Sequence, residues 1–101
     1  MTTDQPSLPN MHDWALEEIA YSTRKATAKL ALRATQPETL DTLVATGVAE
    51  LIVPNWRPWG PSSSINGHIG PEPADDGLYK LEIEMQSGDI IKITAKAFAV
   101  E

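Results

Sequence analysis

The sequence contains no cysteine among its 101 residues. This absence excludes thiol chemistry, Fe–S clusters, zinc sites with cysteine ligands and disulfide staples. A chain of this length fits one domain that can bury a hydrophobic core, so its stability does not require a disulfide or a metal. A cysteine-free composition is consistent with a reducing compartment.

Basic residues are also scarce. The chain has 8 lysines and arginines against 14 aspartates and glutamates, and its formal net charge is −6. The only clustered basic residues are Arg24, Lys25, Lys29 and Arg33. Because proteins that bind nucleic acids usually carry a basic balance, we expect no nucleic-acid partner.

Long apolar runs are absent as well. No stretch of about 18 apolar residues predicts a membrane span. The opening residues, MTTDQPSLPN, have neither the basic start nor the apolar core of a signal peptide. We therefore expect a cytoplasmic protein without membrane contact. The polar opening predicts a flexible N-terminal tail over residues 1–11, followed by a single β domain over residues 12–101.

The clearest pattern is an alternation of apolar and polar residues on both sides of the tripeptide Ser87-Gly88-Asp89. The apolar positions are Tyr79, Leu81, Ile83, Met85, Ile91, Ile93, Ala95 and Ala97. This period predicts an antiparallel hairpin with one buried face. With Gly88 in the left-handed position of a three-residue loop, Ile83 faces Ile91 and Leu81 faces Ile93. A two-residue loop would mix the two faces, so burial excludes it.

The first part of the chain is less clear, because alanine and leucine favour helices. In residues 25–34, however, apolar side chains recur at alternate positions, which share one face of a strand but diverge on a helix. We therefore predict a strand there. We predict a second strand over residues 14–22, paired with the first through a turn near residues 22–24, and a short strand over residues 50–53.

Residues 35–47 leave two alternatives open. Thr35 and Glu38 match a capping box, Pro37 suits a first helical turn, and Gly47 suits a helix stop. The alternative is a loop followed by a strand over residues 42–46. Together the segments predict an all-β, mainly antiparallel fold, either a small β-sandwich or a partly open barrel, with room for one short helix.

Residues 56–73, reading WRPWGPSSSINGHIGPEP, are rich in proline, glycine and tryptophan. Since proline and glycine interrupt helices and central strands, we predict a long, stiffened loop that either binds a partner or covers one end of the fold. In a binding loop, Trp56 and Trp59 form an aromatic platform beside Arg57. In a covering loop, one or both indoles close the core. The candidate binding residues are Trp56, Arg57, Trp59, Ser62, Ser64, Asn66 and His68.

Catalytic and metal chemistry have weaker signals. A serine nucleophile would need His68 as a base and an orienting carboxylate, and no nucleophile-elbow pattern is present, so we assign no catalytic residue. Asp75-Asp76-Gly77 predicts a polar turn, and Glu82 and Glu84 are predicted to be solvated positions on an outer sheet face. We expect no metal and no cofactor, because no ligand spacing is matched by His12, Asp13, His68, Glu72, Asp75 and Asp76.

Three motifs are similar to those of a family of small bacterial proteins of about this length, described as uncharacterised. They are HDW at residues 12–14, PWGPSSSIN at residues 58–66 and EMQSGD at residues 84–89. The similarity spans most of the chain after residue 11. The resemblance implies an all-β domain, which favours the strand over residues 42–46, and it implies no activity. Some similar small bacterial β-proteins are grouped with toxin-immunity proteins.

These features are compatible with three functions. The first is a protein-binding module that uses residues 56–68 as its contact surface, with immunity-type inhibition of a basic partner as one concrete form. The second is a small hydrolase-type enzyme that uses His68 with a loop serine or a carboxylate. The third is a structural protein that forms a homodimer through the edge of its last strand. The alternative oligomeric state is a monomer.

Overall fold

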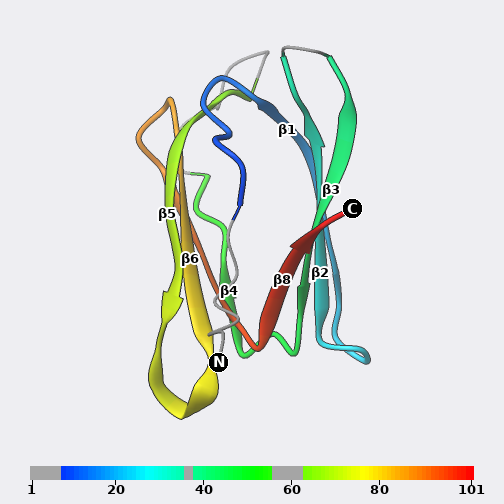
Figure 1. Cartoon of the computed structure of the whole chain (residues 1–101), viewed down its shortest axis with the longest axis vertical. Helices are drawn as coiled ribbons and strands as arrows, with labels where there is room; N and C mark the ends of the chain where they lie inside the picture. Colours follow the sequence, from blue (N-terminus) through cyan, green and yellow to red (C-terminus); the bar gives the residue numbers. More distant parts are fainter. Residues whose placement is uncertain (1–7, 36–37, 56–62) are drawn as a thin grey trace, which may run out of the picture.

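The computed structural model describes residues 8–35, 38–55 and 63–101. In these ranges the chain forms two four-stranded antiparallel sheets that face each other as a β-sandwich (Figure 1). The elements are β1 (Ala15–Ser22), β2 (Thr27–Arg33), β3 (Leu40–Thr46), β4 (Glu50–Ile52), β5 (Ile65–Pro73), the 3₁₀ helix η1 (Asp75–Gly77), β6 (Tyr79–Met85), β7 (Ile90–Ala95) and β8 (Ala97–Val100). Sheet A has the order β1-β2-β3-β8, and sheet B has the order β4-β7-β6-β5. The predicted all-β sandwich is confirmed, and the sheets do not close into a barrel.

The β6–β7 hairpin has the predicted register. Ile83 pairs with Ile91 and Leu81 with Ile93, and all four side chains are buried. The turn closes as expected, because Gly88 takes a φ of 99° and its N–H donates to the Met85 carbonyl at 2.9 Å. Burial of one face therefore fixed this register, as the alternation indicated.

The helix alternative for residues 35–47 is wrong. Residues 40–46 form β3, which lies between β2 and β8 in sheet A. Leu43 pairs with Leu30 on one side and with Val100 on the other. A central strand gains backbone hydrogen bonds along both of its edges, and these bonds outweigh the local helix signals.

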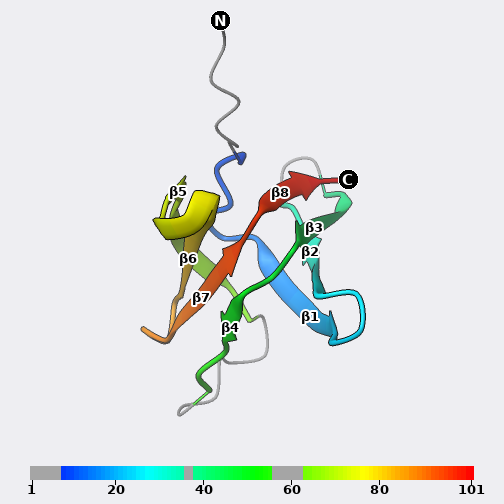
Figure 2. The same ribbon diagram turned by 90° about the horizontal axis from the view of Figure 1, so that it is seen from below.

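Gly47, which suggested a helix stop, instead lies where the chain passes from one sheet to the other. Its φ is 63°, and a Cβ at this position would lie 2.7 Å from Cδ of Lys96. The second passage between the sheets is adjacent, since the Lys96 N–H donates to the Thr46 carbonyl at 3.0 Å. Figure 2 shows β7 of sheet B leading directly into β8 of sheet A at this corner.

The crossing of the chain from β7 to β8 corrects two expectations. The buried face of the hairpin was expected to run on to Ala97, but the strand breaks at Lys96, so that Ala97 is exposed and Phe98 enters the core. The strand that we expected to be last, β7, is also central in sheet B and has no free edge. The last strand, β8, lies at an edge of sheet A, and it spans only 4 residues.

The long loop predicted over residues 56–73 is wrong for its second half, which forms β5. This strand lies at the edge of sheet B, where Pro71 and Pro73 cost no hydrogen bond to an outer neighbour. Its pairing with β6 shifts register twice, between Ile65 and Gly67 and between Ile69 and Glu72. The prolines and glycines therefore mark an irregular edge strand instead of a loop.

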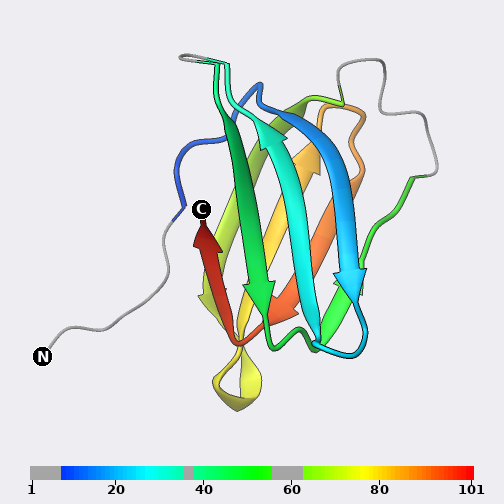
Figure 3. The same ribbon diagram turned by 90° about the vertical axis from the view of Figure 1, so that its right-hand side faces the viewer.

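The core lies between the sheets and includes part of the expected N-terminal tail. Met11 is completely buried, and Leu8 contacts the same cluster. Figure 3 shows the segment that begins at residue 8 running along the side where β5 and β8 form the sheet edges. The ordered domain therefore begins before residue 12. The buried core residues are Met11, Leu16, Ala28, Leu30, Leu32, Leu43, Ala45, Val48, Ile65, Leu81, Ile83, Met85, Ile91, Ile93, Ala95 and Phe98.

Substitution of Met11 tests this extension of the core. Met11→Ala should lower the free energy of unfolding by about 2–5 kcal/mol, because it leaves a cavity beneath the N-terminal segment. The neighbouring Asn10 is exposed and serves as the control, with an expected loss of less than about 1 kcal/mol for Asn10→Ala. Urea denaturation measures both values. Equal, small losses would show that residues 8–11 are a tail after all.

Candidate functional site

The structure describes only part of the predicted binding segment. Trp56, Arg57, Trp59 and Ser62 lie outside the described residues. Ser64 forms an isolated β-bridge with Ala15. Asn66 and His68 belong to β5, where Asn66 is exposed and His68 is half-buried. Three of the seven candidates are therefore placed, and all three lie at or on one edge strand.

The HDW segment (His12–Trp14) pairs with the start of this edge strand. The Asp13 N–H donates to the Ile65 carbonyl at 2.8 Å, and the Ile65 N–H donates to the Trp14 carbonyl at 2.8 Å. The Gln86 N–H donates to the Ser64 carbonyl at 2.9 Å. The described parts of the three motifs noted in the sequence thus meet in one place.

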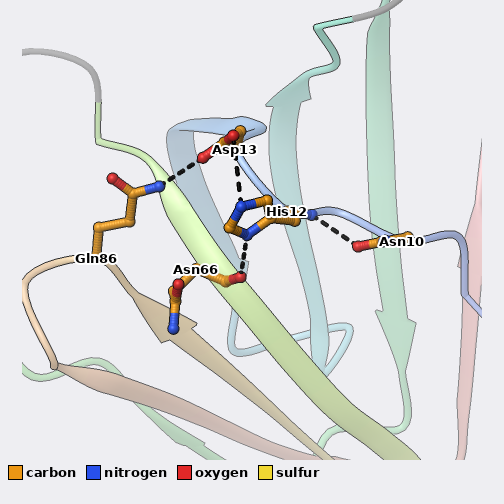
Figure 4. Close-up of polar contacts among 5 residues, drawn as sticks. All are labelled: Asn10, His12, Asp13, Asn66 and Gln86. Atoms are coloured by element: carbon orange, nitrogen blue, oxygen red, sulfur yellow. Dashed lines mark hydrogen bonds and ion pairs between the residues drawn. The ribbon is translucent and has the colours of Figure 1, made fainter.

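Side chains reinforce this backbone pairing (Figure 4). His12 Nδ1 lies 2.6 Å from the Asn66 carbonyl oxygen and donates to it, because a carbonyl oxygen only accepts. Gln86 Nε2 donates to Asp13 Oδ1 at 2.7 Å, and His12 Nε2 lies 3.4 Å from Asp13 Oδ2. Asp13 takes a φ of 67°, in the left-handed region that aspartate and asparagine adopt more readily than most residues.

This arrangement protects a sheet edge. An edge strand exposes backbone N–H and C=O groups that can pair with another chain, and proteins cover such groups or interrupt them with proline. The HDW segment covers the first part of β5, and Pro71 and Pro73 interrupt the last part. Contact through the edge of β5 is therefore disfavoured, and its outer face is the surface that remains available.

That outer face carries a groove, which we call the sheet B groove. It is lined by Gly67, His68, Ile69, Glu82, Glu84 and Ile90 and has a volume of about 260 Å³. The register explains the lining, because Gly67 pairs with Glu84, Glu84 pairs with Ile90, and Ile69 pairs with Glu82 across the sheet. Ile69 is 59% exposed, so an apolar side chain stands in solvent beside two carboxylates.

The two carboxylates of the groove differ in their partners. Glu82 lies 3.4 Å from the Lys80 ammonium and pairs across the sheet with Lys92. Glu84 accepts a hydrogen bond from Asn66 Nδ2 at 3.1 Å, and no cation contacts it among the described residues. The negative charge of the groove is therefore concentrated at Glu84.

His68 does not meet the geometric condition set by the enzyme hypothesis. The hypothesis needs the imidazole within about 3.2 Å of a serine hydroxyl or a carboxylate. Within the described part of the chain, the His68 ring makes no hydrogen bond and no ion pair. Burial lowers the pKa of His68 below its usual value. His68 is the cross-strand partner of the buried Ile83, which places it on the core-facing side of the sheet and explains this desolvation.

The other residues considered for chemistry are dispersed. No group of three acidic or histidine side chains that could hold a metal ion occurs in the described ranges. Asp75-Asp76-Gly77 forms the short turn η1, as predicted. In the basic cluster, Arg33 contacts Glu17 at 2.7 Å and Glu38 at 3.2 Å, and the hydrogen bond and charge of Glu17 raise the pKa of Arg33. The charge of Arg33 is thus balanced by two acidic side chains. In this respect it differs from the exposed Arg24, Lys25 and Lys29.

Sequence reasoning missed the apolar part of the groove. Glu82 and Glu84 were expected to be outward-facing, and they are, but Ile69 was assigned to a loop. Ile90 was not assigned to either face of the hairpin. The β-branched Ile65 and Ile69 on either side of Gly67 were an available signal for a strand, and two register shifts disguised it.

The pH dependence of the free energy of unfolding tests the environment of His68. An imidazole in the unfolded chain takes up a proton below about pH 6.5, whereas burial delays protonation of His68 in the folded chain. The unfolded state then binds more protons, so the free energy of unfolding should fall as the pH drops below about 6.5. Denaturation between pH 7.5 and 5 should show a weaker fall for His68→Gln than for wild type. Identical pH dependence in wild type and His68→Gln would show that burial does not shift the pKa of His68.

Comparison with known proteins adds a fold neighbour. Neither the family models nor the curated proteins contain a match to this chain. The fold is similar to that in a crystal structure of an uncharacterized protein from Neisseria gonorrhoeae, with a TM-score of 0.60 and 17% sequence identity over 92% of this chain and 95% of that one. This likeness shows the fold alone. No helix in the described residues is long and apolar enough to cross a membrane.

Proposed function

We propose that this protein is a protein-binding module, that its contact surface is the outer face of sheet B, and that its partner is basic. The sheet B groove carries this proposal. It combines an exposed isoleucine at the rim with a carboxylate that no described cation balances. Apolar side chains exposed beside polar ones are typical of surfaces that bind other proteins.

The position of the groove adds support. It lies on β5, which directly follows the tryptophan-rich residues singled out in the sequence. Trp56, Arg57, Trp59 and Ser62 thus remain candidates for the same contact surface by their proximity in the chain. Tryptophan and arginine are frequent in the residues that dominate binding energy.

The charge of the chain indicates the kind of partner. A net charge of −6 attracts a basic protein over distances of several ångströms and speeds its association at low salt. One concrete form is immunity-type inhibition of a basic toxin, which the motif resemblance supports. Binding of this partner in the cytoplasm is consistent with the absence of cysteine.

Two exposed aliphatic residues allow a matched test. Ile69 is 59% exposed on sheet B, and Leu40 is 67% exposed on sheet A. The immobilised wild-type protein, Ile69→Glu and Leu40→Glu would each be used to capture partners from native-host lysate at moderate salt. The captured protein is then purified, and its affinity for each variant is measured by calorimetry.

The proposal predicts that Ile69→Glu binds at least about tenfold more weakly than wild type. Loss of a side chain at a central contact costs more than about 1 kcal/mol of binding free energy. Leu40→Glu should bind as wild type does. A partner that binds Ile69→Glu normally and loses affinity for Leu40→Glu would place the contact surface on sheet A. Repeated failure to capture any partner would remove support for the binding hypothesis.

A further inference from the structure

Gly67 leaves open space on the β5 side of the sheet B groove. It belongs to the cross-strand row Gly67–Glu84–Ile90 on the outer face of the sheet. A Cβ added to Gly67 would meet no atom within 4 Å, and its φ is not in the left-handed region. The glycine is therefore not required by the backbone or by crowding. Its effect is to leave the surface beside Glu84 uncovered.

The Glu84 carboxylate lies beside this space and is held in place by a hydrogen bond. Asn66 Nδ2 donates to Glu84 Oε1 at 3.1 Å, and no contact to Oε2 is found among the described residues. Asn66 is in turn linked to the HDW segment, because its carbonyl accepts the hydrogen bond from His12. Glu84 thus lines the groove with one carboxylate oxygen bonded to Asn66 and the other without a contact among the described residues. Asn66 is a positioning residue for that oxygen.

The groove is also lined by two isoleucines, Ile69 and Ile90, by a second carboxylate, Glu82, and by His68. Ile69 and Ile90 are 59% and 37% exposed. The volume of about 260 Å³ is smaller than the roughly 300–1,000 Å³ of most small-molecule pockets. A groove of this size, lined by two isoleucines and two carboxylates, fits a single long cationic side chain better than a larger ligand.

Resting on the proposed function, we infer that the groove receives one arginine side chain of the basic partner. The aliphatic stem lies over Gly67 beside Ile69, and the guanidinium binds Glu84, which the register places between Gly67 and Ile90. Glu82 lies on the same face two residues away. Arginine fits better than lysine, because its guanidinium is weakly hydrated and offers five donors in a fixed plane. Arginine is also enriched at protein interfaces, where lysine is depleted.

Peptides that differ only in charge test this inference. The probes are acetyl-Ala-Arg-Ala-amide and the same peptide with citrulline, which is neutral and nearly the same shape. Each is titrated into ¹⁵N-labelled full-length protein, and amide shifts are followed by NMR. The arginine peptide should shift the amides of Gly67, Ile69, Glu84 and Ile90 saturably, and the citrulline peptide should not.

Variants locate the site. Gly67→Leu fills the open space and should abolish these shifts, while the dispersion of its spectrum reports that it remains folded. Glu84→Gln should weaken binding about fivefold, the effect of removing one exposed ion pair. Glu72→Gln, on the same strand outside the groove, is the matched control and should bind as wild type does.

The outcomes separate this inference from the proposed function. Equal shifts with arginine and citrulline, or unchanged binding to both Gly67→Leu and Glu84→Gln, would overturn the arginine site. If a captured partner still loses affinity for Ile69→Glu, the proposed function would stand without it. If the arginine peptide binds selectively while a captured partner ignores Ile69→Glu, the site would stand and the proposed contact surface would not.

Discussion

The backbone pairing between the HDW segment and Ile65 is the constraint on which the rest of the candidate site depends. Ile65 uses both of its backbone groups toward this segment, accepting from Asp13 and donating to Trp14. An edge strand that contains two glycines and two prolines has little else to hold it on its outer side. The pairing fixes where β5 begins, and thereby which of its side chains face outward.

The same segment connects the core to the surface. Met11 is buried between the sheets, while His12 and Asp13, the next two residues, are exposed and bond to β5 and to the β6–β7 turn. Burial of Met11 anchors the segment, and the polar contacts set its register against β5. These contacts offset the conformational strain of the positive φ at Asp13.

The outer face and the edges of sheet B differ in what they offer a partner. The outer face of sheet B alternates charged and aliphatic side chains around a groove, and both of its described edges are short or covered: β4 has 3 residues, and β5 is paired with the HDW segment. A surface with blocked edges favours binding through side chains over binding by strand addition. This distinction is why the groove, and not a sheet edge, is assigned the functional role.

The sequence predicted the fold best where one period was sustained. The alternation over residues 79–95 was long enough to determine both the strands and their register. For β3, the local signals at Thr35, Pro37 and Gly47 favoured a helix about as strongly as a strand. The decisive partners, Leu30 and Val100, lie far away in the sequence.

The candidate site was less predictable for the same reason. His12, Asn66 and Gln86 each stood in a motif. Their convergence, however, depends on two long-range hydrogen bonds, one with a sequence separation of 54 and the other with a separation of 73. Register shifts in β5 hid its alternation, so Ile69 could not be recognised as an outward-facing strand residue.

Amide hydrogen exchange at Asp13 and Ile65 tests the central constraint most directly. Both N–H groups donate to backbone carbonyls in the pairing between the HDW segment and β5. Measured by NMR in the native state, both amides should be protected together, exchanging far more slowly than in an unstructured chain. If both exchange at unprotected rates while the Ile83 amide in β6 stays protected, the edge of β5 is open, and the HDW segment does not hold the candidate site in place.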